Sequence, residues 1–191
     1  MATDSKYVRY RDQGQKANVN NVERFGTPAH SLFIATNFWS ITQKTEITDE
    51  SGKVVYRVKS RAISLHDKTD ITDANGKHVA HIERKVLTLR KVHWITMADG
   101  TKFDVSHELL HIVKDVANIS KLGWTMRGNI FQLNFEIYDK NDNVVAVIGQ
   151  KLVSIKDKYA IDIYQPKYEP EVVAVLVALQ HGVRDDENGS F

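Results

Sequence analysis

The sequence predicts a mainly β protein, a 12-stranded antiparallel closed β-barrel around a buried C-terminal helix. Three observations support this prediction: an internal repeat, a short polar turn inside each copy, and one apolar run near the C-terminus. The repeat is clearest in EITDESGKVVYRVKSR (46–61), DITDANGKHVAHIERK (70–85) and EIYDKNDNVVAVIGQK (136–151). Each copy is typical of a strand, a turn and a second strand.

The spacing of the repeat predicts a β-meander. The first two copies are offset by 24 residues, and Ile47, Ile71, Ile95 and Ile119 continue that spacing. The turns ESG, ANG and KND are rich in Asn, Asp and Gly, which tolerate positive φ in hairpins. The unit accommodates two strands and two turns, so we expect about 12 strands in total. They are centred near 31–36, 45–48, 54–61, 68–72, 78–85, 93–98, 101–108, 116–120, 124–128, 133–138, 144–150 and 159–165.

The C-terminal region predicts one buried helix. Pro166 and Pro170 end the sheet, because proline donates no backbone hydrogen bond. The following EVVAVLVALQHGV (171–183) is apolar on every face for two turns, so a helix there must be buried. A long meander closed around this helix leaves no exposed edge strands.

Composition excludes several classes of protein. The formal net charge is only +2, so no strong basic field points to nucleic acid. The chain has no cysteine, which excludes disulfides, thiolate metal sites and palmitoylation, and it suits the cytosol. MATDSKYVRYRDQGQ lacks the apolar core of a signal peptide, and the longest apolar run, VVAVLVAL, is too short to span a bilayer. We therefore expect a soluble, cytoplasmic protein that is at most peripheral at a membrane.

HELLH (107–111) matches the zinc-hydrolase pattern H-E-x-x-H, in which His107 and His111 would bind zinc beside the base Glu108. The repeat instead predicts an extended chain there. The two histidines would then lie roughly 13 Å apart, too far to share one ion. We interpret the motif as a chance match. The alternative, a zinc hydrolase, rests on partial helical spacing in Val105, Leu109, Ile112, Val113 and Val116. It fails if the purified protein carries no stoichiometric zinc.

Several motifs resemble one family in order and spacing. They are S-L-x-D-K-x-x-I-x-D-x-x-G-K-x-V-x-x-I-x-x-K (64–85), GWTMRGN (123–129), FEIYD…N-x-V-V-A-x-I (135–148) and Y-A-I-D-I…VLVAL…DD (159–186). Over roughly 30–186 the chain resembles bacterial members of the LURP-one-related family, which is similar in fold to the tubby C-terminal domain and the phospholipid scramblases. The resemblance implies a barrel of 12 strands around a C-terminal helix. It leaves 1–29 as an N-terminal extension and 187–191 as a disordered tail.

The resemblance also implies a function, since tubby-like domains bind phosphoinositides through basic side chains. Two departures weaken a scramblase interpretation. The palmitoylated cysteine segment is absent, and the acidic calcium segment appears here as SIKDKYAID, in which Asp157 lies between two lysines. Calcium requires several converging oxygen ligands, and this segment offers few.

Basic residues on the predicted strands are the candidate lipid ligands. Val54, Tyr56 and Val58 share one face of their strand, while the basic residues that follow Tyr56 share the other. Each basic residue near an anionic membrane contributes about 1 kcal/mol. The alternative is an ordinary solvated outer face. The candidates are Arg57, Lys59, Arg61, Arg84, Lys85, Arg90 and Lys91.

The remaining polar residues have structural explanations. Asp49, Asp73 and Asp139 recur at one repeat position, which favours turn capping over catalysis. His78 and His81 lie three apart in a predicted strand, so we expect them on opposite faces. We therefore expect no enzyme, catalytic residue, metal site or cofactor.

The functional hypothesis is a non-enzymatic module that docks on anionic phospholipid or phosphoinositide through surface Arg and Lys. The alternative is a cytosolic scaffold that binds a protein partner. Neither hypothesis involves nucleic acid or a transmembrane segment.

Overall fold

A computed structural model describes residues 21–35, 44–61, 68–87, 90–106, 116–130, 134–151 and 158–188. It confirms the predicted order of 12 strands followed by a helix, here with a short 3₁₀ helix η4 (Pro166–Tyr168) between them. The strands are β1 (His30–Ala35), β2 (Lys44–Thr48), β3 (Val54–Arg61), β4 (Lys68–Asp73), β5 (His78–Leu87), β6 (Arg90–Met97), β7 (Lys102–Ser106), β8 (Val116–Ile119), β9 (Trp124–Asn129), β10 (Asn134–Tyr138), β11 (Val144–Lys151) and β12 (Lys158–Ile163). The helix is α2 (Glu169–Asn188).

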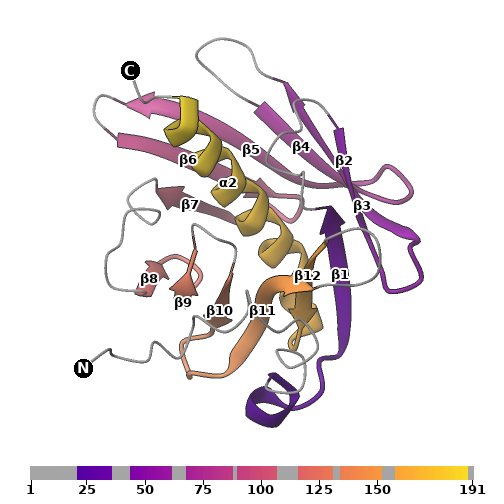
Figure 1. The fold of residues 1–191 in the computed structure, drawn as a ribbon. Helices are drawn as coiled ribbons and strands as arrows, with labels where there is room; N and C mark the ends of the chain where they lie inside the picture. The colour runs from indigo at the N-terminus through magenta and orange to yellow at the C-terminus, as the bar shows by residue number, and fades with distance from the viewer. Residues whose placement is uncertain are drawn as a thin grey trace.

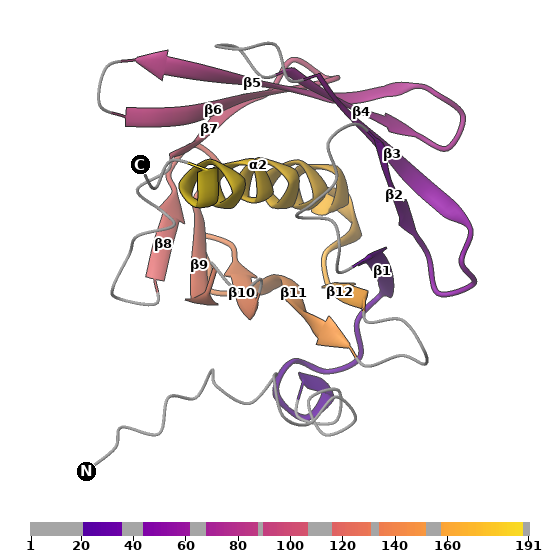
Figure 2. The same ribbon diagram turned by 45° about the horizontal axis from the view of Figure 1, so that its top comes forward.

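The strands form one antiparallel sheet that curves into a nearly closed barrel (Figure 1). The strand order is β7-β6-β5-β4-β3-β2-β1-β12-β11-β10-β9-β8. Neighbours in sequence are therefore neighbours in the sheet, with two exceptions: β1 also pairs with β12, and β7 and β8 lie at the two ends of the sheet, unpaired with each other among the described residues. Figure 2 shows α2 running through the middle of the barrel, with strands on both sides. The predicted architecture is confirmed.

The repeat explains the hairpins. In each repeat the aspartate that precedes the turn accepts backbone N–H bonds: Asp49 from Ser51 and Lys53, and Asp139 from Asn141 and Asn143. Asp73 does the same in the second copy. These bonds confirm the predicted capping role.

A β-bulge also recurs in each hairpin. One extra residue stands on the second strand at repeat-equivalent positions, at Val55, Val79 and Val145. The bulge at Val79 puts His78 on the opposite face of β5 from the one that strict alternation predicts. His78 now pairs with Thr72, and His81 with Asp70, and these two partners lie on one face of β4. The expectation that the two histidines face opposite sides was wrong, because strict alternation ignores the bulged residue.

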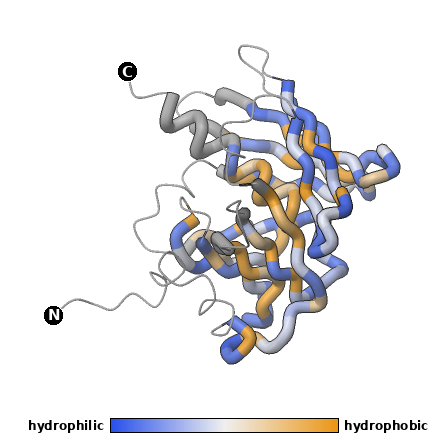
Figure 3. The backbone as a smooth tube through the Cα atoms, turned by 45° about the vertical axis from the view of Figure 1, so that its right-hand side comes forward, coloured by the Kyte–Doolittle hydropathy of each residue, from blue (hydrophilic) through white to orange (hydrophobic). Residues whose placement is uncertain are grey.

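The barrel interior is packed around α2. Eight consecutive helix residues, from Val172 to Leu179, are at most 1% exposed. Inward-facing strand residues such as Ile47, Ile71, Ile95 and Ile119 belong to the same core. Along the strands, hydrophobic residues alternate with hydrophilic ones (Figure 3), as a barrel with a dry interior and a wet exterior requires. A helix buried on every side explains why its sequence lacks a polar face.

The helix is longer than predicted at both ends. It begins at Glu169 and continues to Asn188, so the described part of the expected 187–191 tail is helical. Pro170 lies in the first turn, where the missing N–H has no partner in any helix. The carboxylates of Glu169 and Glu171 beside it lie at the positive end of the helix dipole, where negative charge is favourable. None of the helices in the described part of the chain is long and apolar enough to cross a membrane.

Candidate functional site

The outer face of β3 carries the first group of predicted ligands. Arg57, Lys59 and Arg61 are exposed, while Tyr56 and Val58, which alternate with them, are buried. The predicted division of this strand into a basic and an apolar face is therefore confirmed from Tyr56 onward. The placement of Val54 with Tyr56 and Val58 was wrong, because the bulge at Val55 puts Val54 in register with Thr48.

Arg57 differs from the other two in its contacts. Its guanidinium lies 3.4 Å from the Glu46 carboxylate and donates a hydrogen bond of 2.6 Å to the carbonyl of Ala74. The positive charge of Arg57 is thus balanced by the carboxylate of Glu46 on β2. Lys59 and Arg61, in contrast, form no ion pair with another described residue.

The strand register brings two further lysines to Lys59 and Arg61. Lys44 on β2 lies directly opposite Lys59, and Lys68 on β4 lies directly opposite Arg61. Like charges in such cross-strand pairs repel, by roughly 0.7 kcal/mol at about 6 Å in water. We call these four residues, Lys44, Lys59, Arg61 and Lys68, the basic corner.

Acidic neighbours offset the basic corner only in part. Asp70 lies opposite Lys59, but its carboxylate is hydrogen-bonded to Nδ1 of His81 at 2.7 Å. Glu83 reaches Lys68 at 3.9 Å, near the limit of an ion pair. The corner therefore keeps an excess of positive charge at one end of β2, β3 and β4.

The backbone register places the other predicted ligands away from the basic corner. Arg84 follows the buried Ala80 and Ile82 at every second position of β5, so it lies on the same inner face, in register with His93. For Lys85 the structure describes the backbone alone, in register with Val92 on β6. Arg90 pairs with Leu87, four residues along β5 from Glu83, the partner of Lys68, so its backbone is displaced by roughly 13 Å along the strands from Lys68 and lies two strands away on β6. Lys91 is next to it in β6, opposite Val86.

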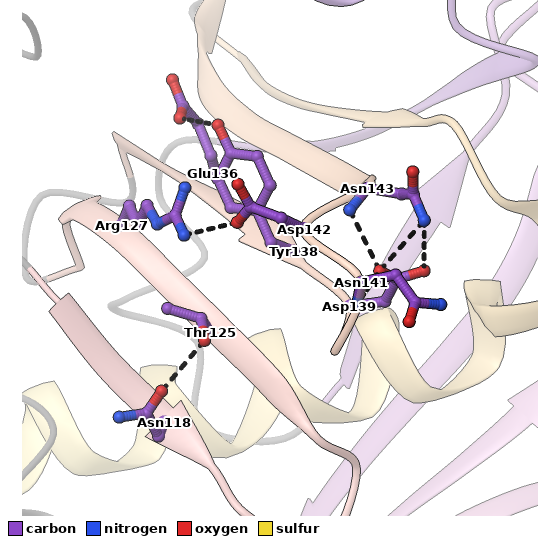
Figure 4. A network of polar contacts seen from close by, with 9 residues as sticks. All are labelled: Asn118, Thr125, Arg127, Glu136, Tyr138, Asp139, Asn141, Asp142 and Asn143. Atoms are coloured by element: carbon purple, nitrogen blue, oxygen red, sulfur yellow. Dashed lines mark hydrogen bonds and ion pairs between the residues drawn. The ribbon is translucent and has the colours of Figure 1, made fainter.

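A second polar surface lies on the outer face of β9 and β10 (Figure 4). Arg127 donates a hydrogen bond of 2.5 Å to Asp142, and its guanidinium lies 4.3 Å from the centre of the Tyr138 ring. The Tyr138 hydroxyl donates to Glu136 at 2.6 Å. Burial, and then the hydrogen bond to Glu136, raise the pKa of Tyr138 above its ordinary value. This tyrosine is therefore a neutral donor at physiological pH.

The family of the chain follows from comparison with known proteins. Residues 30–180 match the model of the family described as LURP-one-related. The chain belongs to the LURP-one-related family. This confirms the resemblance over most of its expected range, and the bacterial origin stays a prediction. Residues 21–29 precede the match and are the described part of the predicted N-terminal extension.

Two further comparisons concern curated proteins and solved structures. The search of curated proteins finds no match. Among solved structures, an X-ray structure of a protein from Arabidopsis thaliana is similar, with 19% sequence identity and a TM-score of 0.49. The similarity covers 85% of this chain and 93% of that chain.

Two residues of the basic corner, Lys44 and Lys68, were missing from the predicted ligands. A signal for them exists, because they occupy the same repeat position in KTEITD (44–49) and KTDITD (68–73). Lys44 meets Lys59, and Lys68 meets Arg61, only when the strands pair. The strand register was therefore needed to recognise these two lysines as ligands. His107, Glu108 and His111 of HELLH lie outside the described residues.

Proposed function

We propose that this LURP-one-related chain is a non-enzymatic binding module that docks on anionic phospholipid membranes through the basic corner. The observation that carries the proposal is the pairing of like charges, Lys44 with Lys59 and Arg61 with Lys68, on an exposed face. Membership of the LURP-one-related family is consistent with a binding module. The protein would then be a peripheral, cytoplasmic one.

Electrostatics gives the expected strength. Each basic residue near an anionic surface contributes about 1 kcal/mol, so the four side chains together contribute roughly 4 kcal/mol. A phosphate group between the paired strands would also relieve their mutual repulsion. Exposed charges are screened by salt, so binding should weaken as ionic strength rises.

The test compares two double variants in co-sedimentation with vesicles that contain phosphatidylserine or a phosphoinositide. Lys59→Ala with Arg61→Ala removes two charges from the corner. The matched control, Lys53→Ala with Lys77→Ala, removes two charges from exposed turns at the opposite ends of the same hairpins. Both variants therefore have the same net charge.

We expect the corner variant to bind anionic vesicles about 30-fold more weakly than the wild type, which corresponds to about 2 kcal/mol. The control variant should bind nearly as well as the wild type. Equal losses in both variants would mean that net charge, and not the corner, determines binding. Unchanged binding of the corner variant would also contradict the proposal.

A further inference from the structure

Glu136 lies on the outer face of the barrel and is nevertheless buried. It alternates along β10 with Phe135 and Ile137, which belong to the core, so its side chain points outward. Only 2% of it is exposed. Asp162 on β12, two strands away in the same register row, is also buried and accepts a hydrogen bond of 2.6 Å from Ser31. Burying a carboxylate is costly unless cations or donors compensate it. The Tyr138 hydroxyl donates to Oε2 of Glu136, which leaves Oε1 for a group that covers this face.

The cover comes from the N-terminal extension. Residues 21–25 form a helical turn that lies outside the barrel (Figure 2). Nη1 of Arg24 lies 2.7 Å from Oε1 of Glu136. The Phe25 ring packs edge-on against Tyr138 and Tyr164, with ring centres 6.4 Å and 6.0 Å away. The Arg24 guanidinium also stacks over the Phe25 ring at 4.4 Å.

The covered surface has the chemistry of a peptide-binding groove. An arginine contacts a buried carboxylate, and an aromatic ring enters a site bordered by two tyrosines, which is how hot-spot residues bind in protein interfaces. An open cleft of about 620 Å³ continues from Arg24 and Phe25 towards Asp142, Asn143 and Gln165. The surface therefore extends beyond the residues that now cover it.

Residues 21–25 are attached to the barrel in a way that would allow them to leave it without breaking the sheet. It precedes the family match, which begins at His30, and it contributes no strand to the sheet. After Phe25 the chain turns at Gly26, whose φ is +78°, and rejoins the sheet through a hydrogen bond from Ala29 N to Ile163 O. Its contacts with Glu136, Tyr138 and Tyr164 are made by the side chains of Arg24 and Phe25.

We propose that the outer face of β9 to β12 is a docking groove for a partner protein segment in which an arginine precedes an aromatic residue. Residues 21–25 are the intramolecular occupant of this groove and must leave before the partner binds. A tethered segment acts at an effective concentration of about millimolar, so it excludes weak competitors. The buried Glu136 selects for a cation, and the pair Tyr138 and Tyr164 selects for a neighbouring ring.

The test uses the full-length chain and a fluorescent peptide with the sequence of residues 21–29. In the variant Arg24→Ala with Phe25→Ala, the groove is vacated, and fluorescence anisotropy should detect binding of the peptide. Wild type should bind the peptide at least about tenfold more weakly, because its own segment competes. Adding Glu136→Gln to the vacated variant should reduce binding about tenfold or more, since it removes the charge that arginine contacts.

Two controls make the outcome decisive. A peptide in which arginine and phenylalanine are separated by scrambling should not bind the vacated variant. If circular dichroism shows that the double variant is unfolded, Arg24→Gln replaces it, because this change keeps Phe25 and an amide donor. Arg24→Gln should then bind the peptide more tightly than the wild type, and adding Glu136→Gln should again weaken that binding. A folded variant that does not bind the peptide would overturn the proposal. Concentration-dependent dimers of the wild type in light scattering would show that a second copy is the occupant, and would overturn the assignment to a partner.

Discussion

Among the glycines whose surroundings the structure describes, Gly128 on β9 is expected to tolerate a side chain least. Its φ is +118°, a conformation that residues other than glycine rarely adopt. It lies opposite Phe135 in the β9–β10 ladder. A Cβ at this position would lie 2.7 Å from the carbonyl oxygen of Asn134 and 3.0 Å from Cα of Phe135. Both are backbone atoms, so relief requires a shift of β10.

The magnitude for Gly128→Ala follows from these two effects. A strained backbone conformation costs about 1–3 kcal/mol. Additional volume in a packed region costs typically about 1–3 kcal/mol. We therefore expect a loss of about 4 kcal/mol, which lowers Tm by roughly 12 °C in a domain of this size.

The assay is thermal unfolding followed by circular dichroism, with Gly76→Ala as the matched control. Gly76 also has a positive φ, +83°, but no atom lies within 4 Å of the position of its Cβ. It therefore reports the backbone strain without the steric overlap, and its Tm should fall by about half as much. If Gly128→Ala is no more destabilising than Gly76→Ala, the close approach of β9 and β10 is wrong.

Three further predictions concern the core, the start of α2 and the turns. Leu176→Ala should cost about 2–5 kcal/mol by chemical denaturation, because Leu176 is 1% exposed inside the barrel, whereas Val22→Ala at an exposed position should cost less than about 0.5 kcal/mol. Burial raises the pKa of Glu171, whose Oε2 is buried with no hydrogen-bond partner among the described residues. A raised folded pKa means that the wild type loses stability as pH rises, so Glu171→Gln should raise Tm at neutral pH, with the gain vanishing below the ordinary glutamate pKa of about 4.3. A gain that persists in acid would contradict this explanation. The backbone N–H of Asn143 holds the pKa of Asp139 below its ordinary value, so this stability is present at neutral pH and is lost as pH falls. Asp139→Asn should therefore lower Tm at neutral pH and much less at about pH 3, and an equal loss at both would refute the role of its charge.

Much of the fold could be predicted because it depends on local sequence. The turn aspartates, such as Asp49, act through hydrogen bonds to residues two and four positions away, which a repeat reveals directly. Alternation gave the correct faces for Tyr56 and Lys59, because both follow the same bulge on β3. It failed for His78 and His81, because a bulge lies between them and inserts a residue that no alternating pattern records.

The surfaces could be predicted less well because they depend on contacts between distant segments. Lys44 and Lys59 meet only through the register of β2 and β3. Arg57 looked equivalent to Lys59 until the structure paired it with Glu46. Glu136 has the pattern of an ordinary exposed strand residue, and its burial depends on Arg24 from a segment far earlier in the chain. Local patterns contain no information about such a contact.

The most direct test of the account is binding of the wild-type protein to vesicles of neutral lipid and to vesicles that also contain anionic lipid, at low and at physiological salt. The basic corner predicts co-sedimentation with the anionic vesicles, weakening as salt rises, and none with the neutral vesicles. Absence of binding to both kinds of vesicle at low salt would contradict the proposed membrane function and leave the barrel as a module for other partners.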